Sequence, residues 1–426
     1  MKALIRSINI DGKTNLRTLE SPVLCYIKIT SCCMLKCSFC SQSEQVKETM
    51  PLEDVKMVLD KLKKEGLATI IYTGGEPLMH NHIVEILKYG KSLGFEQVLV
   101  TNLLNLRVND NEQVLNYINS LGVSLHGVKE VHDKLSNQDG VFDKVVSNID
   151  YVLNNYKNVK VNLNCTLTDM NSNEENMEFL LDFAKKRDIA LSLGRLNYIG
   201  AGLKYKLLDM SKFLPLVERL KEKYSKIDIS NCIARCAVNE KNRYMLHGCG
   251  VGVSMISINP NCDVTICPSS SKVLGNLKEK KFKKIWNCKY LQEYRDLKWV
   301  PMICKLCKEF ESCKGGCHSE ESQCFWKDNC DSLVTQRLNK AWHEIEDNKL
   351  KLHVSNFRID GNEYVILKSR VRKTNKIGFE ILKSVDGSKT GRELVNGFSK
   401  VENIKEFLTT AYIDGILEVR EWRREW

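Results

Sequence analysis

Short apolar runs alternate with amphipathic segments between residues 23 and 196 of this 426-residue chain. Runs of the first kind are typical of buried strands, whereas hydrophobic residues that recur every three or four positions indicate helices. The predicted strands are 23–30, 68–72, 97–101, 122–125, 159–167 and 190–196. The predicted helices are 51–66, 82–93, 111–119, 142–155 and 174–187. Repeated alternation of this kind predicts an α/β fold in which helices lie outside a parallel sheet.

Residues that can carry chemistry follow several of these strands. A cysteine-rich loop follows the first strand, a glycine-rich turn at 74–77 follows the second, and 101–102 and Ser124 end the third and fourth. Parallel barrels place their active sites at the carboxyl ends of the strands. The pattern therefore predicts one site at this end of the sheet.

The loop after the first strand carries Cys33, Cys37 and Cys40 in a C-x3-C-x2-C spacing. Three thiolates at this spacing can hold three irons of a 4Fe–4S cube and leave the fourth iron open to a small molecule. Structural zinc is the alternative, but it prefers four ligands in a closed tetrahedron.

The turn after the second strand reads Gly74-Gly75-Glu76-Pro77. Two glycines allow the backbone to adopt positive φ and to pass close to a ligand. Backbone carbonyls exposed in such a turn can accept hydrogen bonds from an ammonium group. The turn alone is weak evidence of function, because most turns of this kind are only turns.

The cysteine triplet, followed one helix and one strand later by this turn, resembles the core of the radical S-adenosylmethionine (SAM) enzymes. The resemblance covers residues 21–227 and implies a partial (β/α)6 TIM-type barrel, a 4Fe–4S cluster on the triplet, and SAM bound at the open iron. It also implies that the turn 74–77 receives the amino group of SAM and that Ser124 lies near its ribose or carboxylate. Arg195 is the candidate for a further contact with the carboxylate.

The chain departs from the family pattern at two positions. His126 stands where the family has aspartate, so a carboxylate role is not carried over, and Leu103 stands where the family usually has glycine. Either change can reshape the SAM pocket. The favoured interpretation of His126 and His132 is that they are hydrogen-bonded structural histidines.

The fifth predicted strand has one polar and one apolar face. Alternate residues share a face in a strand. Its apolar face comprises Val161, Leu163, Cys165 and Leu167, and its polar face comprises Asn162, Asn164, Thr166 and Thr168. A polar face directed into an incomplete barrel suits cofactor or substrate binding, which makes Asn164 a candidate. Cys165 is interpreted as a small core residue.

Composition adds limits rather than chemistry. The net charge of +11 is spread along helical faces without a dense basic tract, so a solvated basic surface is favoured over a nucleic-acid partner. No apolar run approaches 18 residues and the N-terminal segment 1–20 lacks the apolar core of a signal peptide. A cytoplasmic protein without a membrane partner is expected.

The 18 cysteines are unevenly placed, with five in 25–40, one at 165 and twelve in 232–330. In a cytosolic chain, clustered thiols indicate metal ligands rather than disulfides. Residues 228–345 contain a dense run at Cys304, Cys307, Cys313 and Cys317, with Cys249 and Cys267 upstream.

This second region resembles the SPASM extension of radical SAM enzymes that modify peptides, which usually holds two auxiliary 4Fe–4S clusters. The resemblance assigns the second auxiliary cluster to Cys304, Cys307, Cys313 and Cys330, with Cys324 as the alternative to Cys330. It assigns the first to Cys249, Cys267 and Cys317. The family's usual fourth cysteine is absent, so Cys236 is the candidate, with Cys232 and Cys262 as alternatives and an open iron if none binds. Zinc in place of iron remains an alternative here.

Residues 350–426 read as a small module. Two short strands flank an Asp360-Gly361 turn. Three helices follow: one at 377–385, a second that starts at a capping box at 390–393, and a third at 404–414. A last strand at 416–419 ends the module. The pattern resembles the PqqD-like domain, which is winged-helix-like and binds leader peptides of ribosomally made natural products. A purely structural winged-helix cap is the alternative.

Together these features predict a radical SAM enzyme that matures a ribosomally made (RiPP) precursor peptide. The resemblance implies that reductive cleavage of SAM gives a 5′-deoxyadenosyl radical, that the radical takes hydrogen from the peptide, and that a thioether or carbon–carbon cross-link forms. A reductant such as flavodoxin or ferredoxin is expected as a partner. The alternatives are a sulfatase-type protein-modifying maturase, a peptide epimerase, and a non-catalytic iron–sulfur electron-transfer or binding protein.

Overall fold

The computed structural model describes residues 19–43, 46–197, 199–206, 208, 210–230, 232–235, 243–244, 246, 248–296, 309–313, 316–317, 332–353, 356–360, 363–367, 371–374, 376–401, 403–413 and 416–419. The chain divides into two compact units. The first comprises Met1–Ile233 and Val238–Trp299, and the second comprises Ala234–Ala237 and Val300–Trp426.

The first unit contains a ten-stranded sheet with the order β10-β9-β8-β1-β2-β3-β4-β5-β6-β7. Its parallel strands are β1 (Leu24–Thr30), β2 (Thr69–Gly74), β3 (Glu96–Thr101), β4 (Ser120–Ser124), β5 (Lys160–Leu167), β6 (Ala190–Arg195) and β7 (Ile227–Ile229). β8 (Met255–Ile258) pairs in parallel with β1, and β9 (Asp263–Thr265) and β10 (Val273–Asn276) follow in antiparallel pairing. The predicted α/β partial barrel is confirmed, and all six predicted strands form.

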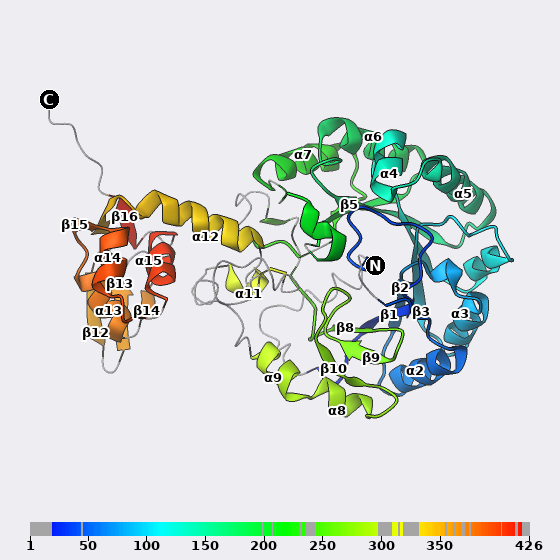
Figure 1. Ribbon diagram of the computed structural model, residues 1–426, viewed down its shortest axis with the longest axis horizontal. Helices are drawn as coiled ribbons and strands as arrows, with labels where there is room; N and C mark the ends of the chain where they lie inside the picture. The colour runs from blue at the N-terminus through cyan, green and yellow to red at the C-terminus, as the bar shows by residue number, and fades with distance from the viewer. Residues whose placement is uncertain are drawn as a thin grey trace. The chain divides into compact units, whose positions relative to one another are not determined.

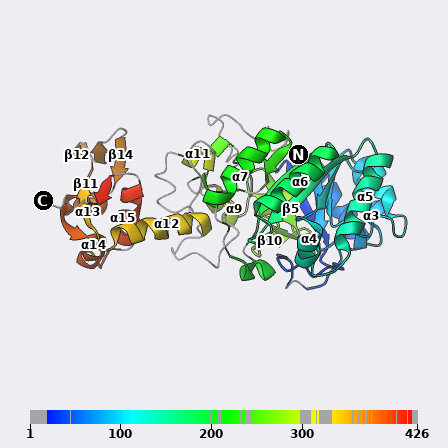
Figure 2. The same cartoon turned by 90° about the horizontal axis from the view of Figure 1, so that it is seen from above.

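Helices cover the outside of these strands, as Figures 1 and 2 show for α3 to α6. The helices of this unit are α2 (Leu52–Lys64), α3 (Ile83–Ser92), α4 (Lys129–Ser136), α5 (Val141–Asn155), α6 (Glu174–Lys186), α7 (Met210–Lys223), α8 (Phe282–Trp286) and α9 (Lys289–Arg295), with short 3-10 turns at Pro77–Met79, Asn111–Asn116 and Gly200–Lys204. The helix expected over 111–119 was wrong, because only the 3-10 turn forms there. Sequence periodicity also missed α4, α7, α8 and α9 and the strands β7 to β10.

Two side chains show which face of the sheet is directed outward. The Tyr72 hydroxyl donates to Gln97 Oε1 at 2.7 Å, and Gln97 Nε2 donates at 2.7 Å to a backbone carbonyl of α3. Both side chains therefore face the helical layer. Ile27 is in register with Tyr72 and shares its face. Because successive strand residues alternate, Tyr26 and Lys28 belong to the inner face.

The second unit contains two three-stranded antiparallel sheets, ordered β15-β11-β16 and β12-β13-β14. Its strands are β11 (Lys349–Leu352), β12 (Asn356–Asp360), β13 (Glu363–Leu367), β14 (Val371–Thr374), β15 (Asp386–Thr390) and β16 (Leu417–Val419). Its helices are α11 (Phe310–Cys313), α12 (Ser332–Ile345), α13 (Lys376–Lys383), α14 (Gly391–Gly397) and α15 (Ile404–Ile413).

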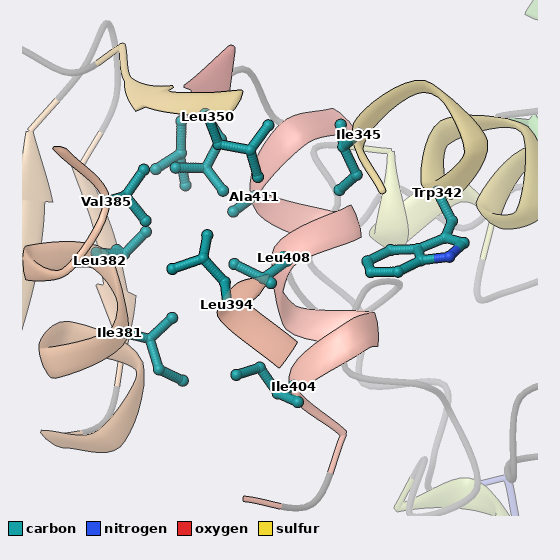
Figure 3. Close-up of a cluster of buried hydrophobic side chains, with 12 residues drawn as sticks. Trp342, Ile345, Leu350, Ile381, Leu382, Val385, Leu394, Ile404, Leu408 and Ala411 are labelled. Carbon is teal, nitrogen blue, oxygen red and sulfur yellow. The ribbon is translucent and has the colours of Figure 1, made fainter. Parts of the chain in front are cut away.

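A compact apolar core holds the C-terminal elements together. Trp342 and Ile345 from α12 pack with Leu350 of β11 and with side chains of α13, α14 and α15, among them Leu382 and Leu408 (Figure 3). The expected hairpin, three helices and last strand all form. The capping box is also confirmed, since the Thr390 hydroxyl accepts from Glu393 N–H and the Glu393 carboxylate accepts from Thr390 N–H. Strands β11, β14 and β15 were not expected, and the PqqD-like identity stays a prediction.

Candidate functional site

The three thiols of the first cysteine loop lie close enough to influence one another. Cys33, Cys37 and Cys40 are partly buried and form no disulfide. Burial, assisted by the charge of Cys40, raises the pKa of Cys33 to about 11 and that of Cys37 to about 12. Without a cation the thiols of Cys33 and Cys37 stay protonated at neutral pH. Loading iron would therefore release protons.

The donor set of this loop suits a cube better than a single ion. Among the described residues, no three His, Cys, Asp or Glu side chains converge closely enough to hold one metal ion. Four zinc ligands must meet around one centre. In a cube each thiolate binds a different iron, so the three thiols surround the group without meeting at a point. The loop thus supplies the three thiols that a 4Fe–4S group with one open iron requires, one fewer than the four ligands of a structural zinc site.

The glycine-rich turn is pressed against the backbone of the cysteine loop. A Cβ atom on Gly74 would lie 2.0 Å from the carbonyl oxygen of Thr30, and one on Gly75 would lie 2.1 Å from that of Cys32. Gly75 N–H donates to Thr30 O at 2.7 Å, and Glu76 N–H donates to Cys32 O at 2.7 Å. Gly74 has a φ of 138°, which side chains rarely adopt. Both glycines are therefore required by the contact between two loops, whatever ligand the turn receives.

Glu76 connects this turn to the end of β3. Its side chain is 1% exposed. One carboxylate oxygen accepts from the Thr101 hydroxyl at 2.6 Å, and the other accepts from Asn102 N–H at 2.7 Å. Burial raises the pKa of Glu76 to about 6, although these hydrogen bonds act in the opposite direction. Asn102 in turn directs its amide toward Cys33 Sγ, at 3.9 Å. Glu76 is thus a structural carboxylate that fixes the site, a role that the sequence did not reveal.

A row of polar residues crosses the inner face of the sheet. Strand register aligns Ser124 with Asn164, Asn164 with Ser192, and Ser192 with Asp228. All four side chains are partly exposed, and parallel alignment places them on one face. The polar face predicted for β5 is confirmed. The sequence analysis missed Ser192 and Asp228. The alternation of apolar and polar residues in β6 and β7 could have identified them as residues of the polar face.

Within this row of polar residues, the side chain of Asn164 occupies space that a side chain at Gly122 would fill. Arg195 does not belong to the row. A Cβ on Gly122 would lie 2.6 Å from Asn164 Nδ2, so the absence of a side chain there accommodates the amide. Arg195 is in register with Leu167, alternates to the opposite face, and is 4% exposed. The register therefore does not bring Arg195 together with Ser124 and Asn164.

The two candidate histidines are structural. His126 N–H donates to His132 Nδ1 at 3.1 Å, and His126 Nδ1 accepts from Thr166 N–H at 3.2 Å. The edge of Phe39 packs against the His126 ring with centroids 4.8 Å apart. Burial lowers the pKa of His126 to about 3 and that of His132 to about 4, so both rings are neutral at pH 7. Acceptance of hydrogen bonds at both Nδ1 atoms requires this neutral form.

Three cysteines of the second region lie near enough to one tyrosine of β1 to influence its ionisation. Burial and then the thiolates of Cys232, Cys267 and Cys249 raise the pKa of Tyr26 to about 12. The three thiols come from segments after β7, after β9 and before β8, so the fold brings segments that are separate in sequence near the phenol. Cys262 is elsewhere, because the charges that act on its buried thiol are those of Asp54, Lys278, Asp263 and Lys61.

The remaining predicted ligands fall into two groups. Cys313 Sγ accepts from Arg235 N–H at 3.3 Å, and both Cys313 and Cys317 belong to the second unit. Five cysteines lie outside the described residues: Cys236, Cys304, Cys307, Cys324 and Cys330. Cys165 is buried as expected of a core residue, and burial raises its thiol pKa.

In the described part of the chain, no helix combines the length and the apolar character needed to cross a lipid bilayer.

Comparison with known proteins gives two family matches. Residues 27–184 match the Radical SAM superfamily, and residues 249–318 match SPASM, an iron-sulfur cluster-binding domain. Together they include the cysteine triplet, the glycine-rich turn and most of the second cysteine region.

Individual relatives are distant. GTP 3′,8-cyclase of Clostridium perfringens (strain SM101) is 29% identical over 46% of this chain and 62% of its own length. PqqA peptide cyclase of Xanthomonas oryzae pv. oryzae (strain MAFF 311018) is 22% identical over 71% of this chain and 84% of its own. The chain spans about three fifths of the length of the first of these relatives.

Among solved structures, Streptococcus suis SuiB bound to S-adenosylmethionine superposes with a TM-score of 0.63 at 20% identity. The superposition covers 78% of this chain and 79% of SuiB. It shows that the two chains share a fold.

Proposed function

We propose that this chain, which is a radical SAM enzyme with a SPASM domain, matures a ribosomally made precursor peptide. The observation that carries the proposal is the pair of 2.7 Å backbone hydrogen bonds, Gly75 to Thr30 and Glu76 to Cys32, that join the glycine-rich turn to the cysteine loop. They support the proposal because they hold the glycine-rich turn against the cysteine loop at one end of the barrel. A similar fold occurs in SuiB bound to its precursor peptide SuiA, and a more distant sequence relative is a peptide cyclase.

In this proposal Cys33, Cys37 and Cys40 hold the 4Fe–4S group at which SAM binds. Gly74, Gly75, Glu76 and Pro77 present the turn that receives the SAM amino group. When bound, such a group would supply the electron for reductive cleavage of SAM, and the resulting 5′-deoxyadenosyl radical would take hydrogen from the peptide. Glu76 contributes by fixing the turn.

The polar row of the sheet completes the SAM pocket. Ser124 and Asn164 are in register and offer a hydroxyl and an amide for the ribose or the carboxylate. Arg195 stays a candidate for contact with the SAM carboxylate. It is a weaker candidate than Ser124 and Asn164, because it lies on the opposite face of the sheet.

The second cysteine region would hold the auxiliary iron–sulfur groups. For the first, Cys232 joins Cys249, Cys267 and Cys317, because Cys232 lies with two of these around Tyr26. The expected Cys236 lies outside the described residues and stays the alternative. For the second we keep the assignment to Cys304, Cys307, Cys313 and Cys330, with Cys324 as the alternative.

The C-terminal module, residues 350–426, would bind the leader of the precursor peptide. The sheet β12-β13-β14 ends in two edge strands. An extended peptide can add a strand to such an edge, where main-chain hydrogen bonds supply affinity. A flavodoxin or ferredoxin would deliver electrons, and a cytoplasmic location suits both partners.

The central test uses anaerobically reconstituted full-length protein with reductant and SAM. We expect 5′-deoxyadenosine, and we expect the Cys33→Ala/Cys37→Ala/Cys40→Ala variant to lose this product while it keeps the absorbance of its auxiliary groups. Continued SAM cleavage by the triple variant would refute the assignment. No SAM binding by the wild-type chain would instead favour the electron-transfer alternative.

Mass spectrometry of a co-expressed candidate peptide distinguishes the possible products. Loss of two hydrogen atoms indicates a thioether or carbon–carbon cross-link. An unchanged mass with deuterium uptake indicates epimerisation. Retention of full activity after deletion of residues 350–426 would favour the sulfatase-type maturase, which does not need a leader-binding module.

A further inference from the structure

Lys28 is a buried cation on the inner face of β1. Its side chain is 3% exposed, and it is in register with Thr73 of β2, directly before the glycine-rich turn. Most other lysines of the first unit lie on the surface or pair with carboxylates. Within the described residues, Lys28 forms no ion pair and no side-chain hydrogen bond.

A buried ammonium group without a counter-charge is unfavourable, because it loses its hydration and gains nothing in return. The inner face around Lys28 offers no described carboxylate to compensate it. Burial accordingly lowers the pKa of Lys28 to about 8. Only one charge acts in the opposite direction, that of the Cys267 thiolate.

The surroundings of Lys28 are those of the second cysteine region. Tyr26, two residues earlier on the same face, is influenced by Cys232, Cys267 and Cys249. Lys28 therefore shares the inner face of β1 with Tyr26 and lies near enough to Cys267 to be influenced by its charge. As protonated thiols they are neutral, but as ligands of an iron–sulfur group they are thiolates, and the loaded group is an anion.

We propose that Lys28 is the counter-ion of the auxiliary iron–sulfur group held by Cys249 and Cys267 and that its charge raises the reduction potential of that group. This inference rests on the proposed function. The redox step is the gain of one electron from a ferredoxin-class reductant or from the substrate radical, and no bond or proton changes place. The reduced group carries one more negative charge, so a nearby ammonium stabilises it more than the oxidised group. A higher potential makes the group a better acceptor for the electron released when the peptide product forms.

The test compares full-length variants in the Cys33→Ala/Cys37→Ala/Cys40→Ala background, where only auxiliary groups give a signal. Lys28→Met removes the charge and keeps an apolar chain of similar length, whereas Lys28→Arg keeps the charge. Lys88→Met is the matched control, since it removes one charge from an exposed position of α3. Midpoint potentials are measured by redox titration followed by electron paramagnetic resonance.

We expect Lys28→Met to lower the midpoint of one auxiliary signal, Lys28→Arg to restore most of it, and Lys88→Met to leave it unchanged. An unchanged midpoint in Lys28→Met at full iron content would overturn the proposal, as would equal shifts in Lys28→Met and Lys88→Met. A change in SAM affinity of the otherwise wild-type Lys28→Met enzyme with no shift in potential would assign Lys28 to SAM instead. Absence of any auxiliary signal in the parent would refute the proposed function itself.

A second measurement covers the case in which Lys28→Met assembles poorly. A counter-ion stabilises the loaded protein and destabilises the iron-free one. We therefore expect Lys28→Met to raise the Tm of the iron-free chain at pH 7 and to reduce the gain in Tm on iron loading. A purely structural lysine would lower the Tm of both forms, and that result would also overturn the proposal.

Discussion

The backbone N–H of Glu76 donates a 2.7 Å hydrogen bond to the carbonyl oxygen of Cys32, the residue directly before the first thiol of the triplet. The carboxylate of the same residue holds the end of β3. One residue thus ties together the loops that follow β1, β2 and β3. Placement of the proposed cofactor ligands depends on this connection rather than on the loops individually.

Gly75→Ala should disrupt the connection. The added Cβ would lie 2.1 Å from Cys32 O, and a backbone atom held by hydrogen bonds cannot move aside cheaply. We expect a loss of about 1–3 kcal/mol in the free energy of unfolding, the range for overpacking, together with reduced iron content. Urea unfolding and iron analysis measure both. Gly397→Ala is the control, because nothing lies within 4 Å of its Cβ position. Equal behaviour of the two variants would contradict the argument.

Glu76 should give the iron-free protein a distinctive pH dependence. Because burial raises its pKa from 4.5 to about 6, the folded state binds the proton more tightly than the unfolded state. The contribution of Glu76 to the free energy of unfolding is complete below pH 4.5 and is lost as the pH rises through about 6. This change amounts to about 2 kcal/mol. Glu76→Gln cannot ionise, so its stability should fall less over this window in urea unfolding. Parallel curves for the two proteins would show that Glu76 is not responsible.

The sequence predicted the barrel well because each strand and helix carries its own periodicity. It could not predict what depends on contacts between loops. Gly74 and Gly75 suggested a ligand, yet their immediate neighbours are Thr30 and Cys32. Leu103 is a clearer case: it adopts the positive φ of 64° that favours glycine, and its fully buried side chain offsets the strain. Leu103 therefore holds a conformation that a glycine would adopt without strain.

The auxiliary ligands were uncertain for a related reason. Cys232, Cys236 and Cys262 are all near enough in sequence, and spacing alone does not distinguish them. The path of the chain after β7 brings Cys232 near Tyr26 of β1 and leaves Cys262 among other charges, whereas Cys236 lies outside the described residues. Lys28 was missed because a single lysine within an apolar strand gives no periodic signal.

The histidine pair should make the iron-free protein sensitive to acid. Burial lowers the pKa of His126 and His132 to about 3 and 4, so between pH 4 and 6.5 the unfolded state binds more protons than the folded state. The contribution of the two histidines to the free energy of unfolding is complete above pH 6.5 and falls as the pH decreases. This pH dependence is opposite in sign to that of Glu76. His126→Asn keeps an acceptor for Thr166 N–H but cannot titrate. We expect this variant to lose stability more slowly than the wild type between pH 6.5 and 4.5 in urea unfolding, and an identical decline would contradict the prediction.

Cys232→Ser should remove one auxiliary iron–sulfur group, because serine is a poor substitute for a thiolate ligand at a site shared with Cys249 and Cys267. A cube with a lost ligand is labile, so we expect about four fewer irons per chain after anaerobic reconstitution. Cys262→Ser is the matched control: its thiol is fully buried among different charges, and the change should cost stability without costing iron. Iron and sulfide analysis with Mössbauer spectroscopy measures the difference. Loss of iron in Cys236→Ser but not in Cys232→Ser would return the fourth position to Cys236, and the thiols around Tyr26 would then have to be explained as packing.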